Sequence, residues 1–145
     1  MRLPAEQYQQ ILERVPVLCV DGIIVNPQGR FLLVKRRNAP RQGEWWVPGG
    51  RVLKGETLEA AFTRKIREEL GIEVTILIPV GYFEVRHDDD PRGGPEGVHQ
   101  VSVVFAAVAV SPDVTLDDQS SDWGFFDRLP EPFSRFQSFN AWLAR

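Results

Sequence analysis

Hydrophobic and polar positions alternate most regularly in residues 57–70 of the chain. The apolar side chains recur there at the spacing of one helix face: Leu58, Phe62, Ile66 and Leu70. Thr57 suits an N-cap and Gly71 suits the position just past the last turn, so the pattern predicts one helix over 57–70. Glu69 falls within the apolar stripe, where a buried carboxylate is costly unless a cation or hydrogen-bond donors receive it.

Glu69 has several candidate partners. Lys65, one helical turn earlier, can form an ion pair with it, and a rotated helix would place the carboxylate at the solvent margin. The Gly49-Gly50 turn before the helix instead offers backbone carbonyls that can approach a metal ion also reached by Glu68 and Glu69. Ligation by oxygen atoms alone suits Mg2+ or Mn2+.

Strand patterns and turn signals occupy most of the remaining chain. Apolar and β-branched runs predict a hairpin, closed by the turn at 26–29, a strand before the helix, and further strands after it. The predicted strand ranges are 15–25, 31–34, 74–86, 98–110 and 123–126. Segments 88–97 and 111–122 are polar and predict connections. Together with the helix over 57–70, this order predicts an α/β domain with helices packed on a mixed sheet.

Shorter helices are predicted at both ends of the chain. One spans 4–14, and its small apolar stripe must dock on its own domain or on a second subunit to be stable. The stripe consists of Tyr8, Ile11 and Leu12. The other begins at Pro130 and carries an aromatic-rich face. Its apolar residues are Phe133, Phe136, Phe139, Trp142 and Leu143.

Composition narrows the class of protein. With 145 residues, 43% of them hydrophobic and 26% charged, the chain has the size and balance of a single globular domain, 1–145. A net charge of −3 argues against general binding to nucleic acids or anionic membranes. Cys19 is the one cysteine, which excludes an internal disulfide and a cysteine-rich zinc site. The N-terminal residues contain no apolar run of signal-peptide length, so we expect a cytoplasmic protein.

Several polar residues interrupt the apolar strands. Asp21 lies within the 15–25 strand. It either occupies an edge or bulge position beside Gly22, or it binds a ligand. Three cationic residues, Lys35-Arg36-Arg37, follow the 31–34 strand. They are either exposed to solvent at the strand end or form a rim that contacts phosphate. His87 and His99 stand on either side of the 88–97 loop.

The glycine turn and the charged helix together resemble the Nudix box. All but one of its defined positions agree: Gly50, Glu56, Arg64, Ile66, Glu68, Glu69, Gly71 and Ile72. The resemblance implies a Nudix hydrolase with an α/β/α sandwich fold, an Mg2+ or Mn2+ cofactor and a nucleoside diphosphate derivative as substrate. Lys65 departs from the box, where relatives carry a glutamate that binds metal or acts as a general base, and this argues against cleavage with several metals.

Segments around the box are similar to the GDP-mannose mannosyl hydrolase branch of that family. The likeness runs from about residue 5 to 128 and is carried by 20–26, 31–36, 42–52 and 56–62. This branch also lacks the glutamate at the position of Lys65, and it binds a single metal and attacks sugar C1, which leaves GDP and free hexose. The resemblance therefore implies that Lys65 marks the sugar-hydrolysing branch.

The branch also implies roles for individual residues. The Gly49 carbonyl, Glu69 and Gln119 would hold the metal, with Glu68 as a further candidate ligand. The diphosphate would be neutralised by Arg36, Arg51 and Arg64, although Arg64 can instead form a structural ion pair with Glu56 or Glu68. Asp21 and His87 would lie beside the sugar or the leaving group.

Ser120 is a second departure, because the branch has its histidine base directly after the metal-binding glutamine. A serine hydroxyl cannot accept a proton from water as a general base at neutral pH. The base is then Asp122, His87 or Asp88, or the metal and arginines carry a slower reaction, or the substrate differs.

The leading hypothesis is a Mg2+-dependent hydrolase of a nucleoside-diphosphate sugar, GDP-mannose or GDP-glucose. The second is phosphorus-centred hydrolysis of another nucleoside diphosphate derivative, with Glu68 and Glu69 both binding metal. The third is a nucleotide-binding module that has lost catalysis, as Lys65 and Ser120 together permit. The N-terminal stripe and the resemblance both favour a homodimer.

Overall fold

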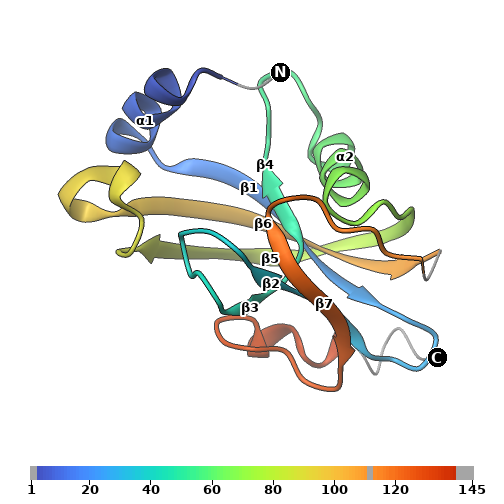
Figure 1. Cartoon of the computed structure of the whole chain (residues 1–145). Helices are drawn as coiled ribbons and strands as arrows, with labels where there is room; N and C mark the ends of the chain where they lie inside the picture. The colour runs from blue at the N-terminus through green and yellow to red at the C-terminus, as the bar shows by residue number, and fades with distance from the viewer. Residues whose placement is uncertain (1–2, 111–112, 140–145) are drawn as a thin grey trace.

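The computed structural model describes residues 3–110 and 113–139, which fold around one seven-stranded mixed sheet (Figure 1). The main strand order is β3-β2-β1-β6-β5, with β4 paired to β1 and β7 paired to β2. The strands are β1 (Val17–Val25), β2 (Phe31–Arg36), β3 (Trp45–Trp46), β4 (Gly49–Arg51), β5 (Val74–His87), β6 (Val98–Ala109) and β7 (Ser120–Phe126). β1 runs parallel to β6 and antiparallel to β2 and β4. The predicted α/β class is confirmed.

Helix α2 (Leu58–Leu70) is the predicted charged helix, and it packs on one face of the sheet (Figure 1). The Thr57 hydroxyl accepts a hydrogen bond from the Ala60 amide, and Gly71 ends the helix in the left-handed conformation, at φ 64°. Three residues of the predicted stripe, Phe62, Ile66 and Leu70, are buried against β1, β2 and β6, and Leu58 is partly buried. The buried helix residues are Ala61, Phe62, Lys65, Ile66, Glu69 and Leu70.

The chain after β7 packs on the opposite face of the sheet. Leu129, Phe133 and Phe136 are buried there, together with residues of β1 and β2. The predicted terminal α-helix is wrong for the segment just after Pro130, which contains only the 3-10 turn η2 (Ser134–Phe136). The Gln137 side chain accepts from the Leu129 amide at 2.8 Å, which stabilises a compact turn there. Trp142 and Leu143 lie outside the described residues.

Helix α1 (Ala5–Arg14) docks on its own domain, the first of the two predicted alternatives. Leu12 is buried with Val17, Cys19 and Val98, and Tyr8 packs against this cluster. The helix also lies beside η1 (Pro91–Glu96), a 3-10 segment in the predicted 88–97 loop. Among the helices that the structure describes, none is long and apolar enough to cross a membrane.

Two local predictions differ from the structure. β1 lies inside the sheet, so Asp21 is not at an edge, and its side chain is buried. β7 begins at Ser120, within the predicted 111–122 connection, because its pairing with β2 extends as far as Arg36 opposite Ser120. Both differences come from strand pairing, which apolar periodicity in one segment does not specify.

Candidate active site

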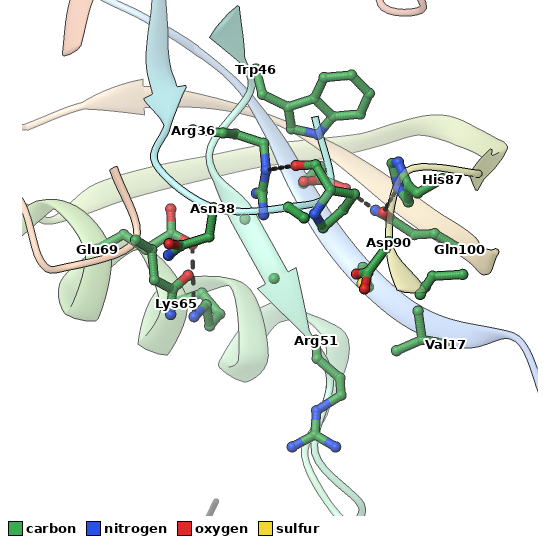
Figure 2. Close-up of a pocket in the computed structure, with 18 of the residues that line it drawn as sticks. Val17, Arg36, Asn38, Trp46, Arg51, Lys65, Glu69, His87, Asp90 and Gln100 are labelled. Carbon is green, nitrogen blue, oxygen red and sulfur yellow. Dashed lines mark hydrogen bonds and ion pairs between the residues drawn. The ribbon is translucent and has the colours of Figure 1, made fainter. Parts of the chain in front are cut away.

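One cavity of about 600 Å3 brings together nearly all of the predicted site residues. It opens between α2, β4, the end of β2 and the start of β6 (Figure 2). The predicted residues that line it are Asp21, Arg36, Gly49, Arg51, Arg64, Glu68, Glu69, His87 and Gln119. Asp122 does not line it, since this side chain is exposed on β7 and accepts from the Trp123 amide. Asp88, another candidate base, is also exposed and outside the cavity lining.

The glycine turn forms β4, which approaches β1 too closely for any larger side chain. A Cβ added to Gly49 would lie 2.1 Å from the Val20 carbonyl oxygen and 2.5 Å from Asp21 Oδ1. At Gly50 it would lie 2.3 Å from Cε of Lys65. The glycines therefore allow β4 to pack directly between the central strand and α2, which places the turn backbone in the cavity.

Lys65 and Glu69 form a buried ion pair on the cavity side of α2 (Figure 2). Nζ of Lys65 lies 3.7 Å from Oε1 of Glu69 and 3.6 Å from Oε2 of Glu68, whose side chain is 49% exposed. Burial raises the pKa of Glu69 to about 8, against the opposing effect of Lys65. One cation beyond hydrogen-bond distance thus compensates the buried carboxylate only in part.

Arg64 forms the structural ion pair that was the alternative to phosphate binding. Its guanidinium donates to both Glu56 carboxylate oxygens, at 2.7 and 2.9 Å, and to the Arg51 carbonyl at 3.0 Å. Glu68 accepts from the remaining nitrogen at 3.3 Å. The fork connects the segment before α2 to the helix, and Arg64 still contributes to the cavity wall.

The other two predicted arginines reach the cavity from different strands. Arg36, at the end of β2, donates from Nε to the Pro40 carbonyl at 2.5 Å, which orients its guanidinium (Figure 2). Arg51, at the end of β4, lies over the Tyr8 ring with Cζ 4.4 Å from the ring centroid. Both therefore place a permanent positive charge at the cavity.

Asp21 and His87 meet through a glutamine that sequence reasoning missed. His87 Nε2 lies 2.6 Å from Gln100 Oε1, and Gln100 Nε2 lies 3.4 Å from Asp21 Oδ2 and 2.7 Å from Ser102 Oγ. Burial raises the pKa of Asp21 to about 7, whereas the hydrogen bond from Ser102 and the Arg36 charge oppose that rise. The sequence did contain a signal for this pair: Gln100 and Ser102 are polar residues two apart in the mostly apolar β6, so their side chains lie on the same face of the strand.

Gln119 is positioned by backbone hydrogen bonds to the two walls of the cavity. The preceding Asp117 amide donates to the Glu69 carbonyl at 3.1 Å, and the Gln119 carbonyl accepts from the Arg37 amide at 3.1 Å. The Gln119 amide donates to the Asp117 side chain at 3.0 Å, which closes a tight turn. Ser120, next in the chain, is buried and lines the same cavity.

The oxygen atoms around Glu69 fit a hard divalent cation. Among the described residues no three His, Cys, Asp or Glu side chains gather as a metal cluster, so carboxylates alone cannot complete a coordination shell. Gly49 and Gln119 line the same cavity as Glu68 and Glu69, and they carry further oxygen donors in a backbone carbonyl and a side-chain amide. Lys65 adds a positive charge beside both carboxylates, which favours one bound cation over several.

Comparison with known proteins decides the family. The NUDIX domain model matches residues 15–134, a range that includes the cavity strands and all of α2. The chain belongs to the NUDIX family. This confirms the resemblance expected from the glycine turn and helix.

Individual NUDIX relatives differ in their names. The chain is 36% identical over 126 residues to the low-salt glycan biosynthesis protein Agl8 of Haloferax volcanii, covering 87% of this chain and 80% of that protein. It is 37% identical over 112 residues to an ADP-ribose pyrophosphatase of Methanocaldococcus jannaschii, covering 77% and 62% respectively. It is 30% identical over 110 residues to the nucleoside triphosphatase NudI of an Enterobacter strain, covering 72% and 78%.

Solved structures support the same family and fold. A MutT NUDIX hydrolase from Burkholderia pseudomallei superposes with a TM-score of 0.64 at 33% identity, covering 88% of this chain and 96% of that one. The MutT protein of Methanosarcina mazei superposes with a TM-score of 0.72 at 23% identity, covering 91% and 98%, which shows a shared fold. The protein is a Nudix hydrolase by family, and such enzymes use divalent metal ions such as Mg2+.

Proposed function

We propose that this Nudix protein hydrolyses a nucleoside-diphosphate sugar such as GDP-mannose or GDP-glucose, with Mg2+ bound, and releases GDP and free hexose. The observation that carries the proposal is Lys65, which places a buried cation where a metal-binding glutamate is expected. A reaction at the sugar carbon needs less metal charge than one at phosphorus, because the attacked atom bears no anionic oxygens. The name of the Haloferax relative, a glycan biosynthesis protein, also supports a sugar substrate.

In this proposal Glu69, the Gly49 carbonyl and Gln119 hold the metal, and Glu68 is a further ligand. Bound there, the metal supplies positive charge to the diphosphate as its leaving oxygen becomes an anion. Arg36 and Arg51 line the same cavity and stabilise the same charge. Cleavage of the bond from C1 to the phosphate oxygen leaves the electron pair on that oxygen, and water oxygen then bonds to C1.

The proton of the attacking water needs an acceptor. Of the candidate bases Asp122, His87 and Asp88, only His87 lines the cavity. Asp21 also lines it, and with a pKa raised to about 7 this carboxyl is close to the neutral pH at which a general base is efficient. Asp21 therefore joins His87 as a candidate inside the cavity. Of the two, the geometry favours Asp21, because both ring nitrogens of His87 already have hydrogen-bond partners.

Hydrolysis in 18O-labelled water tests the proposal directly. GDP-mannose, GDP-glucose, ADP-ribose and a nucleoside triphosphate are incubated with the protein and Mg2+, and the products are examined by mass spectrometry. We expect the label in hexose and unlabelled GDP. Label in a phosphate product would reject attack at C1.

A second candidate function is attack at phosphorus on another nucleoside diphosphate derivative. The names of the Methanocaldococcus and Enterobacter relatives favour it, as does the presence of both Glu68 and Glu69 in the cavity wall. The same labelling assay identifies it by the position of the label.

A catalytically inactive binding module would instead bind nucleotide sugars in calorimetry without turnover at any Mg2+ or Mn2+ concentration.

A further inference from the structure

A line of hydrogen bonds crosses the cavity wall from the loop before β3 to the centre of the sheet. Arg41 donates from Nε to Nδ1 of His87 at 3.3 Å, on the ring side opposite to Gln100. His87 and Gln100 lie side by side in Figure 2, joined at 2.6 Å. Gln100 continues the line to Ser102 and Asp21.

The direction of every bond in this line follows from Arg41. A guanidinium has donors and no acceptor, so Nδ1 of His87 must accept and the ring proton must lie on Nε2. Nε2 then donates to Gln100, which must present its carbonyl oxygen to the ring. The Gln100 amide group consequently points its N–H bonds at Asp21 and Ser102. The reversed amide would bring two donors together at the histidine.

Arg41 is held in place by contacts other than the histidine. Its backbone amide donates to Asp89 Oδ2 at 2.6 Å, and its guanidinium lies 5.5 Å from the centroid of the Trp46 ring. Trp46 also packs edge-on against His87, with ring centroids 5.9 Å apart. These contacts fix both the donor and the ring that receives its hydrogen bond.

The surroundings of His87 favour a neutral ring. Burial is the main cause that lowers its pKa, and the positive charges of Arg41 and of Arg36 on β2 act in the same direction. Asp89 and the Gln100 hydrogen bond oppose them, and Asp90 also faces the ring. A neutral imidazole has one donor and one acceptor, which matches its two observed partners.

We propose that Arg41 and Gln100 are positioning residues that hold His87 as its Nε2-protonated tautomer and direct an amide donor at Asp21. With both ring nitrogens occupied, His87 orients Gln100 instead of taking a proton from water. The Asp21 carboxylate is then held toward the cavity by two neighbouring donors, Gln100 and Ser102. The link to catalysis rests on the proposed function, whereas the tautomer itself does not.

Nitrogen NMR of the 145-residue chain tests the tautomer without turnover. The chain has two histidines, so 15N-histidine labelling gives two ring systems, and a His99→Gln variant assigns the remaining one to His87. Long-range proton–nitrogen correlation distinguishes a protonated Nε2 from a protonated Nδ1. We expect wild-type His87 to be Nε2-protonated at neutral pH. Protonation on Nδ1 in the wild-type protein would overturn the proposal.

Variants separate positioning from simple structural support. Arg41→Met should shift His87 toward the Nδ1-protonated tautomer, whereas Arg86→Met, an exposed neighbour in β5, should leave the tautomer unchanged. An unchanged tautomer in Arg41→Met would also overturn the proposal. Gln100→Glu keeps an acceptor for Nε2 but removes the donor to Asp21, so we expect the tautomer to persist while kcat falls. If Gln100→Glu turns over substrate as fast as the wild-type protein, the link to Asp21 is wrong. If the wild-type protein itself shows no turnover, only the proposed function is contradicted.

Discussion

Glu69 is the residue on which the proposed metal site depends. It is buried, and the distance from its Oε1 to Nζ of Lys65, 3.7 Å, is longer than a hydrogen bond. The helix periodicity of the sequence correctly placed this carboxylate on the buried face, but it did not show that the Lys65 ammonium also lies within 4 Å of Glu68. That second contact depends on side-chain conformation, which periodicity does not specify.

Glu69→Gln should remove most activity and Mg2+ affinity while the fold survives, because the amide keeps the size of the side chain but not its charge. Metal affinity is measured by calorimetry with Mn2+ and by the Mg2+ dependence of turnover. Glu68→Gln is the matched control, and the half-exposed position of Glu68 predicts a smaller effect. Unchanged metal dependence in Glu69→Gln would mean that Glu69 is only the ion-pair partner of Lys65.

Gly49 and Gly50 give a second prediction at the residue scale. Gly49→Ala should lower the free energy of unfolding by about 3 kcal/mol, because its methyl group would meet the backbone oxygen of Val20 in the central strand. Gly50→Ala meets the flexible end of the Lys65 side chain and should cost about 1 kcal/mol. Urea unfolding monitored by tryptophan fluorescence measures both values. Equal losses would contradict the role of the Val20 contact.

At the scale of elements, α2 is the part of the protein that sequence predicted best. Its N-cap, its buried stripe and its left-handed Gly71 are all as expected, because each is a local property of the chain. The terminal helix does not begin at Pro130 as predicted: a 3-10 turn follows, and Gln137 bonds to the backbone of Leu129 and Asp127. Those contacts stabilise a turn that aromatic spacing alone does not reveal.

The Glu56 and Arg64 fork predicts a pH effect on the start of α2. The hydrogen bond that Glu56 accepts from Arg64 is the main cause that lowers the pKa of Glu56 to about 2. A lowered carboxyl pKa contributes stability that is complete above the unfolded pKa, about 4.5, and that is lost as the pH falls toward about 2. Glu56→Gln should therefore cost about 1 kcal/mol at pH 7, a modest figure because the pair is partly exposed, and nothing at the acid limit.

Denaturant unfolding across this pH range measures the Glu56 contribution. A double-mutant cycle with Arg64→Met isolates the coupling between the two side chains. The coupling should vanish in acid and weaken with added salt, since the pair is near the surface. A coupling energy of zero at pH 7 would show that the observed fork does not stabilise the protein.

At the scale of the whole molecule, we expect the protein to form a homodimer. α1 docks on its own domain, yet large apolar side chains remain exposed around the α1 and β1 junction. They are Ile11, Val15 and Leu18, with exposed fractions of 38%, 52% and 44%. Light scattering at micromolar concentration should give twice the chain mass of 16.5 kDa. A monomer mass would contradict this prediction, and Leu18→Lys should weaken a dimer that uses this surface.

The sequence by itself determined the α/β class, the helix with its caps, the glycine turn and the NUDIX family, because these depend on local spacing and residue type. Nearly all of the site residues that it predicted line the cavity, although their roles remain proposals. The tertiary structure decided which candidates meet. Parallel pairing of β1 with β6 brings Asp21 beside Gln100 and Ser102, and the path of β7 leaves Asp122 outside. Strand pairing and burial are long-range properties, so no single segment of the chain contains them.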